Sequence, residues 1–370
     1  MDDLFKKTKI DIILLIPMIL VSFIGLLMIY SASNVIGLEK YNDQFYFFKR
    51  QLVFYIVGII LSIFIIKIDI NKIKKHTTLI FIICFILLIA VLIPGIGVLR
   101  GGARSWINLG FINIQPSETM KIALVLVYAK YLSNHNQDLQ KFKFFIFALS
   151  LSLVIFGIIM LQPDFGTGLV ILLSSVIILY LAGAKLTHFS IIGVVGIIGF
   201  AILIISAPYR IERILSFLDP WSDPLGSGFQ GIQSLFAITP GGIFGHGFNS
   251  SMQKHFFLPE PQNDFIFAIY IEEFGLIGGI ILISLYLIIL IRAMIITSNL
   301  NNQYLEFLSS GIIVSFFIQI IINIFVVIGL LPVTGITLPL MSYGGSSLII
   351  SMISLSILLN ISKYRSPLLK

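Results

Sequence analysis

The chain has little charge and almost no cysteine. Only 11% of its 370 residues are Asp, Glu, Lys or Arg, while 58% are hydrophobic. Soluble domains carry about a quarter charged residues and are less than half apolar, so this composition excludes a soluble globular enzyme and a disordered chain. The single cysteine, Cys84, cannot form an intrachain bridge, which excludes a disulfide-stapled secreted domain. It lies in an apolar run and is expected to pack as a small hydrophobic side chain.

Histidine is also scarce and shows no ligand spacing. The five histidines do not repeat at the intervals of a metal site, so the sequence predicts no zinc centre. Two glycine clusters, Gly241–Gly247 and Gly344–Ser347, match no nucleotide-binding loop, because no P-loop lysine follows either of them. We expect these glycines to allow close approach of the backbone.

Long apolar runs are what the chain has in abundance. A membrane-spanning helix needs about 20 mostly apolar residues, and windows of that size recur along the sequence. They predict an all-α, polytopic membrane protein with about ten transmembrane helices. The first run is too long for a cleavable signal peptide and lacks a small-residue cleavage site, so it is expected to remain as an anchor. The predicted spans are Ile12–Tyr30, Leu52–Ile66, Thr78–Ile96, Ile114–Leu132, Phe144–Leu161, Phe165–Leu181, Phe189–Ala207, Phe265–Ile291, Leu308–Leu330 and Leu338–Ile361.

Basic residues are distributed unevenly between the two sides of these spans. With the N-terminus in the cytoplasm, 15 of the 24 Lys and Arg residues lie on the cytoplasmic side and 8 on the other, while Lys121 lies within a span. This bias supports an even number of spans with both termini in the cytoplasm. It also explains the net charge of +7 without nucleic acid as a partner. Most acidic residues lie on the extracytoplasmic side, which is a first indication that the chemistry occurs there.

One connection is much longer than the others. It runs over residues 209–263, between the seventh and eighth spans, and is rich in aromatic and aliphatic side chains. Long loops are usually functional or disordered, and these side chains need a surface to bury against. We therefore expect a large folded extracytoplasmic loop within one transmembrane domain that covers residues 1–370.

Ionisable side chains inside the predicted spans are candidates for function. Glu118 and Lys121 stand three residues apart and share a helix face. A charge at the bilayer centre costs about 2.5–3.5 kcal/mol, so the two form either a structural ion pair or the lining of a polar cavity. Glu272 and Glu273 present the same choice, because two charged carboxylates facing lipid would cost about 5–7 kcal/mol together.

Aspartates and cations near the extracytoplasmic ends of the spans are further candidates. Asp164 and Asp264 each precede an apolar run, and aspartate is a preferred helix N-cap that suits the helix dipole. The residue pattern alone therefore favours capping over catalysis for both. Cations on this side either bind phosphate through charge-assisted hydrogen bonds or contact lipid headgroups. They include Arg104, Arg210, Arg213 and Lys254.

Five stretches of the chain resemble the SEDS family (shape, elongation, division and sporulation), the polytopic peptidoglycan glycosyltransferases of bacteria. They stand in the order that the family shows and cover nearly the whole chain. The first three stretches are Gly102–Ile107, Gln115–Glu118 with Lys121, and Gln162–Thr167. The fourth is Arg213–Gln230, which continues into Gln253-Lys254, Leu258–Glu260 and Asp264–Ala268 with Glu272-Glu273, and the last is Leu338–Ser347.

Some features of these stretches resemble particular branches of the family. The division and sporulation members are matched better than the elongation member at three places, Asp219–Trp221, Gln253-Lys254 and Thr337–Pro339.

Two positions depart from the family's pattern. Asn263 stands where the family usually has threonine, and it can still form hydrogen bonds. Ser105 stands where the family usually has arginine, which removes one possible phosphate contact and leaves Arg104 as the matching cation.

The resemblance implies an inverting glycosyltransferase that polymerises lipid II into glycan strands during cell division, with polyprenyl pyrophosphate as the leaving group. The family's essential aspartate falls on Asp264, which would act as general base or hold a divalent cation, Mg²⁺ or Mn²⁺, beside the pyrophosphate. Glu118 and Lys121 fall on the family's central-cavity pair. The other expected cavity or substrate contacts are Arg104, Asp164, Arg210, Lys254, Glu273 and Ser342.

The resemblance also implies partners and a location. The active site would open to the outer face of the bacterial cytoplasmic membrane, where lipid II is the substrate. A class B penicillin-binding protein transpeptidase and other divisome membrane proteins would be partners, and no organic cofactor is expected.

Other functions stay open from the sequence. A transporter that flips lipid II would have similar spans and a similar polar cavity. A scaffold that recruits a transpeptidase without catalysis, or the elongation or sporulation form of the same enzyme, would also fit. Many transporters contain internal repeats and none is evident here, which favours the enzyme.

Overall fold

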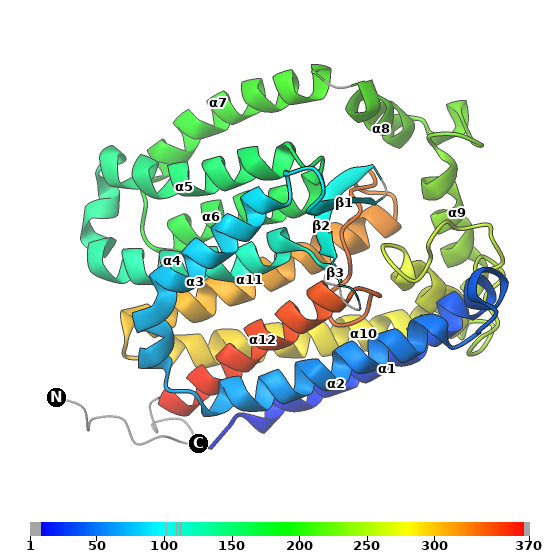
Figure 1. Ribbon diagram of the computed structural model, residues 1–370, viewed down its shortest axis with the longest axis horizontal. Helices are drawn as coiled ribbons and strands as arrows, with labels where there is room; N and C mark the ends of the chain where they lie inside the picture. The colour runs from blue at the N-terminus through cyan, green and yellow to red at the C-terminus, as the bar shows by residue number, and fades with distance from the viewer. Residues whose placement is uncertain (1–8, 101, 109, 111–112, 207, 366–370) are drawn as a thin grey trace.

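The computed structural model describes residues 9–365 apart from 101, 109, 111–112 and 207, and most of these residues are helical (Figure 1). The described helices and strands, with short 3₁₀ turns between some of them, are α1 (Ile12–Tyr41), α2 (Tyr46–Lys67), α3 (Ile70–Ala90), β1 (Gly97–Arg100), β2 (Ala103–Asn108), β3 (Asn113–Ile114), α4 (Pro116–His135), α5 (Phe142–Met160), α6 (Phe165–Leu181), α7 (Leu186–Ile205), α8 (Pro208–Leu218), α9 (Phe229–Ile238), α10 (Ile266–Ser298), α11 (Gln303–Val327) and α12 (Gly345–Ile361).

Seven of the described helices are long and apolar enough to cross a membrane: α1, α2, α3, α5, α10, α11 and the helix that starts with α12. Each predicted span falls on a helix, so the prediction of an all-α membrane protein is confirmed. However, α6 and the described apolar part of α7 are shorter, and α4 carries three charged residues, Glu118, Lys121 and Lys130. The number of ten spans therefore stays a prediction.

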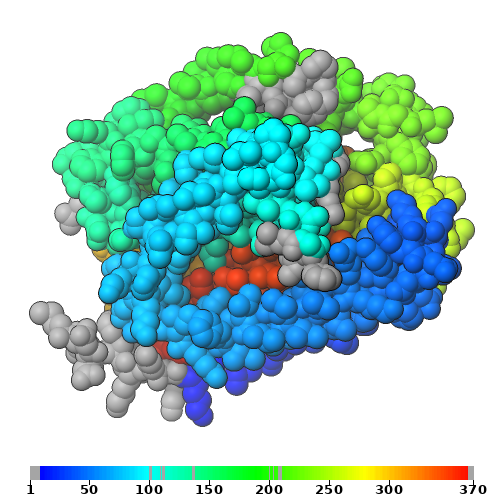
Figure 2. Space-filling model, viewed as in Figure 1, coloured from blue at the N-terminus to red at the C-terminus, as the bar shows by residue number. Residues whose placement is uncertain are grey.

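Apolar side chains cover the outside of the bundle as well as its interior. Ile60, Phe64 and Ile86 of α2 and α3 are 61%, 64% and 59% exposed. Such a surface is unfavourable in water and suits contact with lipid acyl chains. By contrast, α11 and α12 are the most enclosed of the long helices. On the face shown in Figure 2, α12 is visible between α2 and α3.

Several predicted boundaries are wrong. The last predicted span began at Leu338, but α12 begins at Gly345, because residues 338–344 fold as a loop with buried side chains. Helix α3 begins at Ile70 rather than Thr78, where Asp69 caps it by accepting a hydrogen bond from the Asn71 N–H. The predicted loop before α4 contains a three-stranded antiparallel sheet in the order β1-β2-β3.

Helix α10 is interrupted near its N-terminal end. Its backbone leaves helical geometry at Gly275, with φ 65° and ψ −163°. The Leu276 and Ile277 N–H groups donate to the carbonyls of residues 242 and 243 instead of to those of Glu272 and Glu273. In exchange, the carbonyls of Glu272 and Glu273 accept from the N–H groups of residues 246 and 247. The connection before α10 is thus joined to the interruption by four backbone hydrogen bonds.

The long connection between α7 and α10 contains two helices, α8 and α9. Helix α9 packs on α10 and α11, with Ile232, Ser234 and Ala237 buried. The Ser234 hydroxyl donates to the carbonyl of Val327 at the end of α11 (2.7 Å). The α9 part of the connection therefore covers one end of the bundle.

The first and last described residues meet at one end of the bundle. Asp11 caps α1, and its carboxylate binds Arg292 of α10 (2.7 Å) and Arg365. The Ser362 hydroxyl accepts a hydrogen bond from the Asp11 N–H (3.2 Å). The N-termini of α4, α6, α10 and α12 lie together at the opposite end, which we call the Asp264 end.

Candidate active site

Asp264 lies in the turn before α10 and does not cap that helix. The N-cap residue is Phe265, and no side chain forms a capping hydrogen bond there. The capping role that the residue pattern favoured for Asp264 is therefore wrong. No described residue donates a hydrogen bond to the half-buried Asp264 carboxylate, whereas the Asp264 backbone carbonyl is bound by Asn323. An ionisable group whose carboxylate has no donor among the described residues is a candidate for contact with a ligand.

The surroundings of Asp264 raise its pKa. Burial of the carboxylate is the largest cause, and the negative charges of Glu260 and Asp164 add to it, while Arg213 of α8 opposes it. Together they raise the pKa of Asp264 to about 6. Near neutral pH the carboxylate is mostly ionised and still basic enough to accept a proton from a reacting hydroxyl.

Asp164 is held much more firmly than Asp264. It caps α6 by accepting from the Thr167 N–H (3.2 Å). It also accepts from the side chains of Gln115 (2.9 Å) and Ser117 (3.0 Å), which joins the N-termini of α4 and α6. Asp164 therefore combines the predicted capping role with a fixed negative charge near Asp264.

Residues 333–337 form a segment to which several helices bind at the Asp264 end. Three of its backbone carbonyls accept hydrogen bonds from side chains of α8 and α11, so the segment is fixed from two sides. The bonds run from Arg213 to Val333 (3.1 Å), from Asn323 to Ile336 (2.7 Å) and from Gln319 to Thr337 (3.0 Å).

Glycine is required where this segment approaches its neighbours. Gly335 has a φ of 74°, and a Cβ built on it would stand 3.7 Å from Oδ2 of Asp264. On α6, a Cβ at Gly166 would stand 2.6 Å from the carbonyl oxygen of Thr334. The segment thus packs directly against the Asp264 carboxylate and against the start of α6.

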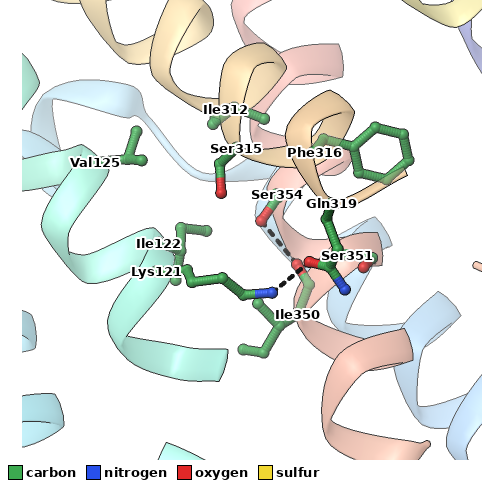
Figure 3. A pocket seen from close by; sticks show the side chains of 10 residues that line it. All are labelled: Lys121, Ile122, Val125, Ile312, Ser315, Phe316, Gln319, Ile350, Ser351 and Ser354. Carbon is green, nitrogen blue, oxygen red and sulfur yellow. Dashed lines mark hydrogen bonds between the residues drawn. The ribbon is translucent and has the colours of Figure 1, made fainter. Parts of the chain in front are cut away.

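Glu118 and Lys121 form a buried ion pair inside the bundle. Their charged atoms are 2.8 Å apart, and the side chains are 5% and 8% exposed. The ammonium of Lys121 also donates to Oε1 of Gln319 on α11 (2.5 Å), as Figure 3 shows. Lys121 and Gln319 line a cavity of about 30 Å³ between α4, α11 and α12, together with three serines, Ser315, Ser351 and Ser354. This is room for about one water molecule.

Lys254 and Glu273 belong to a different cluster. Nζ of Lys254 donates to the carbonyl and side-chain oxygens of Asn249 (2.6 and 2.5 Å) and lies 3.8 Å from the Glu273 carboxylate. Glu273 also accepts from the Ser31 hydroxyl of α1 (2.5 Å), and Glu272 accepts from the Met252 N–H (2.7 Å). These contacts join the 249–254 loop, α1 and α10. The charged groups that act on Asp264 are Glu260, Asp164 and Arg213 instead.

The remaining predicted contacts lie at different places. Arg104 is on β2, half-buried, with its stem against Gly97. Arg210 lies in α8, and its side chain is outside the described residues. The Ser342 hydroxyl accepts from the Leu338 N–H (2.8 Å), which closes the turn before α12.

Sequence reasoning missed two amide side chains of α11, Gln319 and Asn323. A signal was present, because both are polar residues within an apolar span and stand one helical turn apart. Buried polar side chains in such a span need hydrogen-bond partners. Here the partners include the backbone carbonyls of Asp264, Ile336 and Thr337, which lie in the loops before α10 and α12.

The described residues contain no group of three or more His, Cys, Asp or Glu side chains that could hold a metal ion. A dedicated protein cage for a cation is therefore not found among them. Mg²⁺ is commonly bound by one or two carboxylates together with substrate phosphates and water. Because the Asp264 carboxylate accepts no hydrogen bond from the described residues, it fits as the single protein ligand of such a cation.

The fold and the site define an integral membrane protein with a carboxyl of raised pKa at one end of a helical bundle. The chain belongs to the FtsW/RodA/SpoVE family of cell cycle proteins, which it matches over residues 11–367. The predicted membership of the SEDS family is thus confirmed.

Relatives in this family match nearly the full length of the chain. Stage V sporulation protein E of Bacillus subtilis (strain 168) is 49% identical over 360 residues, which are 97% of this chain and 98% of that protein. The FtsW protein of Coxiella burnetii, named a probable peptidoglycan glycosyltransferase, is 40% identical over 343 residues, which are 92% of each chain.

Solved structures share the fold. One comes from a study of the structural coordination of polymerization and crosslinking by a peptidoglycan synthase complex. Its chain has a TM-score of 0.76 and 28% identity, covering 95% of this chain and 97% of that one. RodA of Thermus thermophilus has a TM-score of 0.70 and 24% identity, covering 96% and 98%.

Proposed function

We propose that this protein is a peptidoglycan glycosyltransferase that polymerises lipid II into glycan strands. The observation that carries the proposal is the Asp264 carboxylate, which has a pKa raised to about 6 and no hydrogen-bond donor among the described residues. Family membership and the activity named for the FtsW relative support the same reaction.

The chemistry follows from this carboxylate and the cations near it. The acceptor sugar hydroxyl attacks the anomeric carbon of the donor, forming a C–O bond, while the bond to the polyprenyl pyrophosphate breaks. Asp264 takes the hydroxyl proton as the bond forms. Attack opposite the leaving group inverts the anomeric centre. Arg213 acts electrostatically on Asp264 and can offset negative charge on the pyrophosphate, and we assign the same role to Arg104 and Arg210.

Holding a divalent cation, Mg²⁺ or Mn²⁺, is the alternative use of the same carboxylate. Asp264 would then hold the ion beside the pyrophosphate instead of taking the hydroxyl proton. When bound, such an ion offsets the negative charge that builds up on the leaving group.

The proposal places the Asp264 end at the outer face of the cytoplasmic membrane. Arg292 and Arg365 lie at the opposite end, where the positive-inside rule expects the cytoplasm. Lipid II would enter from the bilayer, and a class B penicillin-binding protein would crosslink the product. The structural neighbour from a synthase complex supports such a partner, and we expect other divisome membrane proteins to join it.

The cellular role that we propose is septal wall synthesis. The FtsW relative at 40% identity supports cell division, whereas the Bacillus subtilis relative at 49% favours a second candidate, wall synthesis during sporulation. Both roles use the same reaction.

The test is polymerisation of lipid II by the purified protein, with and without the transpeptidase, in Mg²⁺, Mn²⁺ or chelator. Asp264→Asn is expected to abolish glycan formation. The matched control is Asp43→Asn, which changes an aspartate in the α1–α2 turn that binds Lys49. Polymerisation by D264N at the parental rate would overturn the assignment. Movement of lipid II across liposomes without any polymer would identify a flippase instead.

A further inference from the structure

Asn323 of α11 connects the backbone of Asp264 to the 333–337 segment. Its side chain is 1% exposed. Nδ2 of Asn323 donates to the carbonyl oxygens of Asp264 (2.8 Å) and Ile336 (2.7 Å). One amide group therefore holds together two loops that are distant in the sequence.

The carbonyl of Asp264 needs this partner. In an uninterrupted helix it would accept from the Ala268 N–H, but that group donates to Phe265 instead (2.9 Å). Buried backbone carbonyls are nearly always paired, because leaving one without a donor costs free energy. Asn323 supplies the donor that the start of α10 does not provide.

The second amide of α11 has a fixed orientation. Oε1 of Gln319 accepts from Lys121, so its Nε2 must point the other way, toward Thr337. Gln319 and Asn323 stand one turn apart on the same helix and bind the adjacent carbonyls of Thr337 and Ile336. The ion pair of Lys121 with Glu118 thereby connects to the segment that faces Asp264.

We propose that Asn323 is a positioning residue for the Asp264 carboxylate, an inference that rests on the proposed function. The carboxylate lies against Gly335, and the same Asn323 amide binds the carbonyls of Asp264 and of Ile336, the next residue after Gly335. The Asn323 amide therefore sets the distance between Oδ2 of Asp264 and the backbone at Gly335. Without it, the turn of residues 260–265 and the 333–337 segment can move apart while the carboxylate itself remains present.

The test compares two buried asparagines that have the same bonding pattern. Asn360 of α12 is 2% exposed, and its Nδ2 also donates to two backbone carbonyls, those of Ile65 (2.9 Å) and Ile68 (2.7 Å). It lies at the end of the bundle away from Asp264. Each of the substitutions Asn323→Leu and Asn360→Leu removes two hydrogen bonds from a buried amide to backbone carbonyls. The cost in stability should therefore be similar, and Asn360→Leu serves as the matched control.

The measurement is kcat and KM for lipid II polymerisation per folded, monodisperse protein, together with the melting temperature. For N323L we expect a loss in kcat of about 100-fold with KM nearly unchanged, because a displacement of about 1 Å can cost that much. For N360L we expect a similar fall in melting temperature with kcat close to that of the parent. Asn323→Asp keeps the shape and removes the donor, and we expect it to behave like N323L.

Other results would distinguish a failure of the positioning role of Asn323 from a failure of the proposed function. Parental kcat in folded N323L and N323D, with D264N inactive, would overturn the positioning role and leave the proposed function intact. Full activity in D264N would overturn the proposed function itself. Failure of both Asn323 variants to fold, while N360L folds, would assign Asn323 to stability and overturn the positioning role as well.

Discussion

Asp164 and Asp264 both precede a helix at the same end of the bundle, but only Asp164 caps one. Asp164 accepts from the Thr167 N–H and from two side chains of the α4 region. Asp264 lies two residues before α10, and the described residues give its carboxylate no donor. The aspartate that caps α6 thus serves the fold, whereas the Asp264 carboxylate accepts no hydrogen bond within the described part of the chain, as the proposed catalytic role requires.

The rate of polymerisation is expected to depend on pH through Asp264. Burial raises the pKa of this carboxyl to about 6, and the base must be ionised to accept a proton. The rate should therefore rise as the pH increases from 5 to 7 and then level off. A rate measured over this range that stays flat, in protein shown to remain folded, would contradict the role of Asp264 as base.

Stability should depend on pH with the opposite sign. The pKa of Asp264 is raised from its ordinary value of 3.8, so the folded state favours the neutral acid. The resulting stabilisation is complete below about pH 4 and is lost as the pH rises through 6. Relative to D264N, the parent should lose melting temperature over this interval. Identical pH dependence of melting in the two proteins would show that the Asp264 carboxyl is not perturbed.

Gly335→Ala is expected to reduce turnover strongly. The φ of 74° strains any side chain, and the new methyl group would point toward Oδ2 of Asp264. Gly329→Ala is the matched control, because its φ is 75° and the nearest atoms belong to Leu235 rather than to the site. Both variants should lose about 1 kcal/mol of stability, and only G335A should lose activity. Equal kcat values in the two variants would contradict this assignment.

Removing one partner of the buried Glu118–Lys121 ion pair should cost more stability than removing both. Lys121→Met leaves Glu118 inside the bundle without its 2.8 Å partner, and such single changes typically cost about 3–5 kcal/mol. The double variant with Glu118→Leu removes both charges and should recover part of that loss. A double-mutant cycle of unfolding free energies in detergent measures the coupling. Simple additivity of the two single effects would rule out an energetically important pair.

Hydropathy predicted the helices well because it depends on local composition. It failed for Leu338–Met341, which reads as the start of a span but lies in a loop whose apolar side chains are buried at the Asp264 end. The small sheet was also missed, since its longest strand has only six residues. Short elements held by their neighbours leave little periodicity to detect.

The site could be predicted only in part from residue patterns. Asp164 and Asp264 have the same local pattern, and a shift of one residue in the start of the helix decides which of them caps. No local rule supplies that shift. Resemblance to a family selected Asp264, whereas the contacts of Asn323 and Lys254 depend on loops that meet only in the folded protein.

The interruption of α10 at Gly275 divides one long helix into two mechanical parts. The residues from Ile266 to Phe274 are tied by backbone hydrogen bonds to the 242–247 loop, where an intact helix would have continued its own ladder. The same loop is also bonded to Leu276 and Ile277, the first residues after the interruption. It therefore splints both halves of α10 at Gly275, and a substitution that displaces the loop changes the angle at which the short half, with Asp264 just before it, leaves the long half.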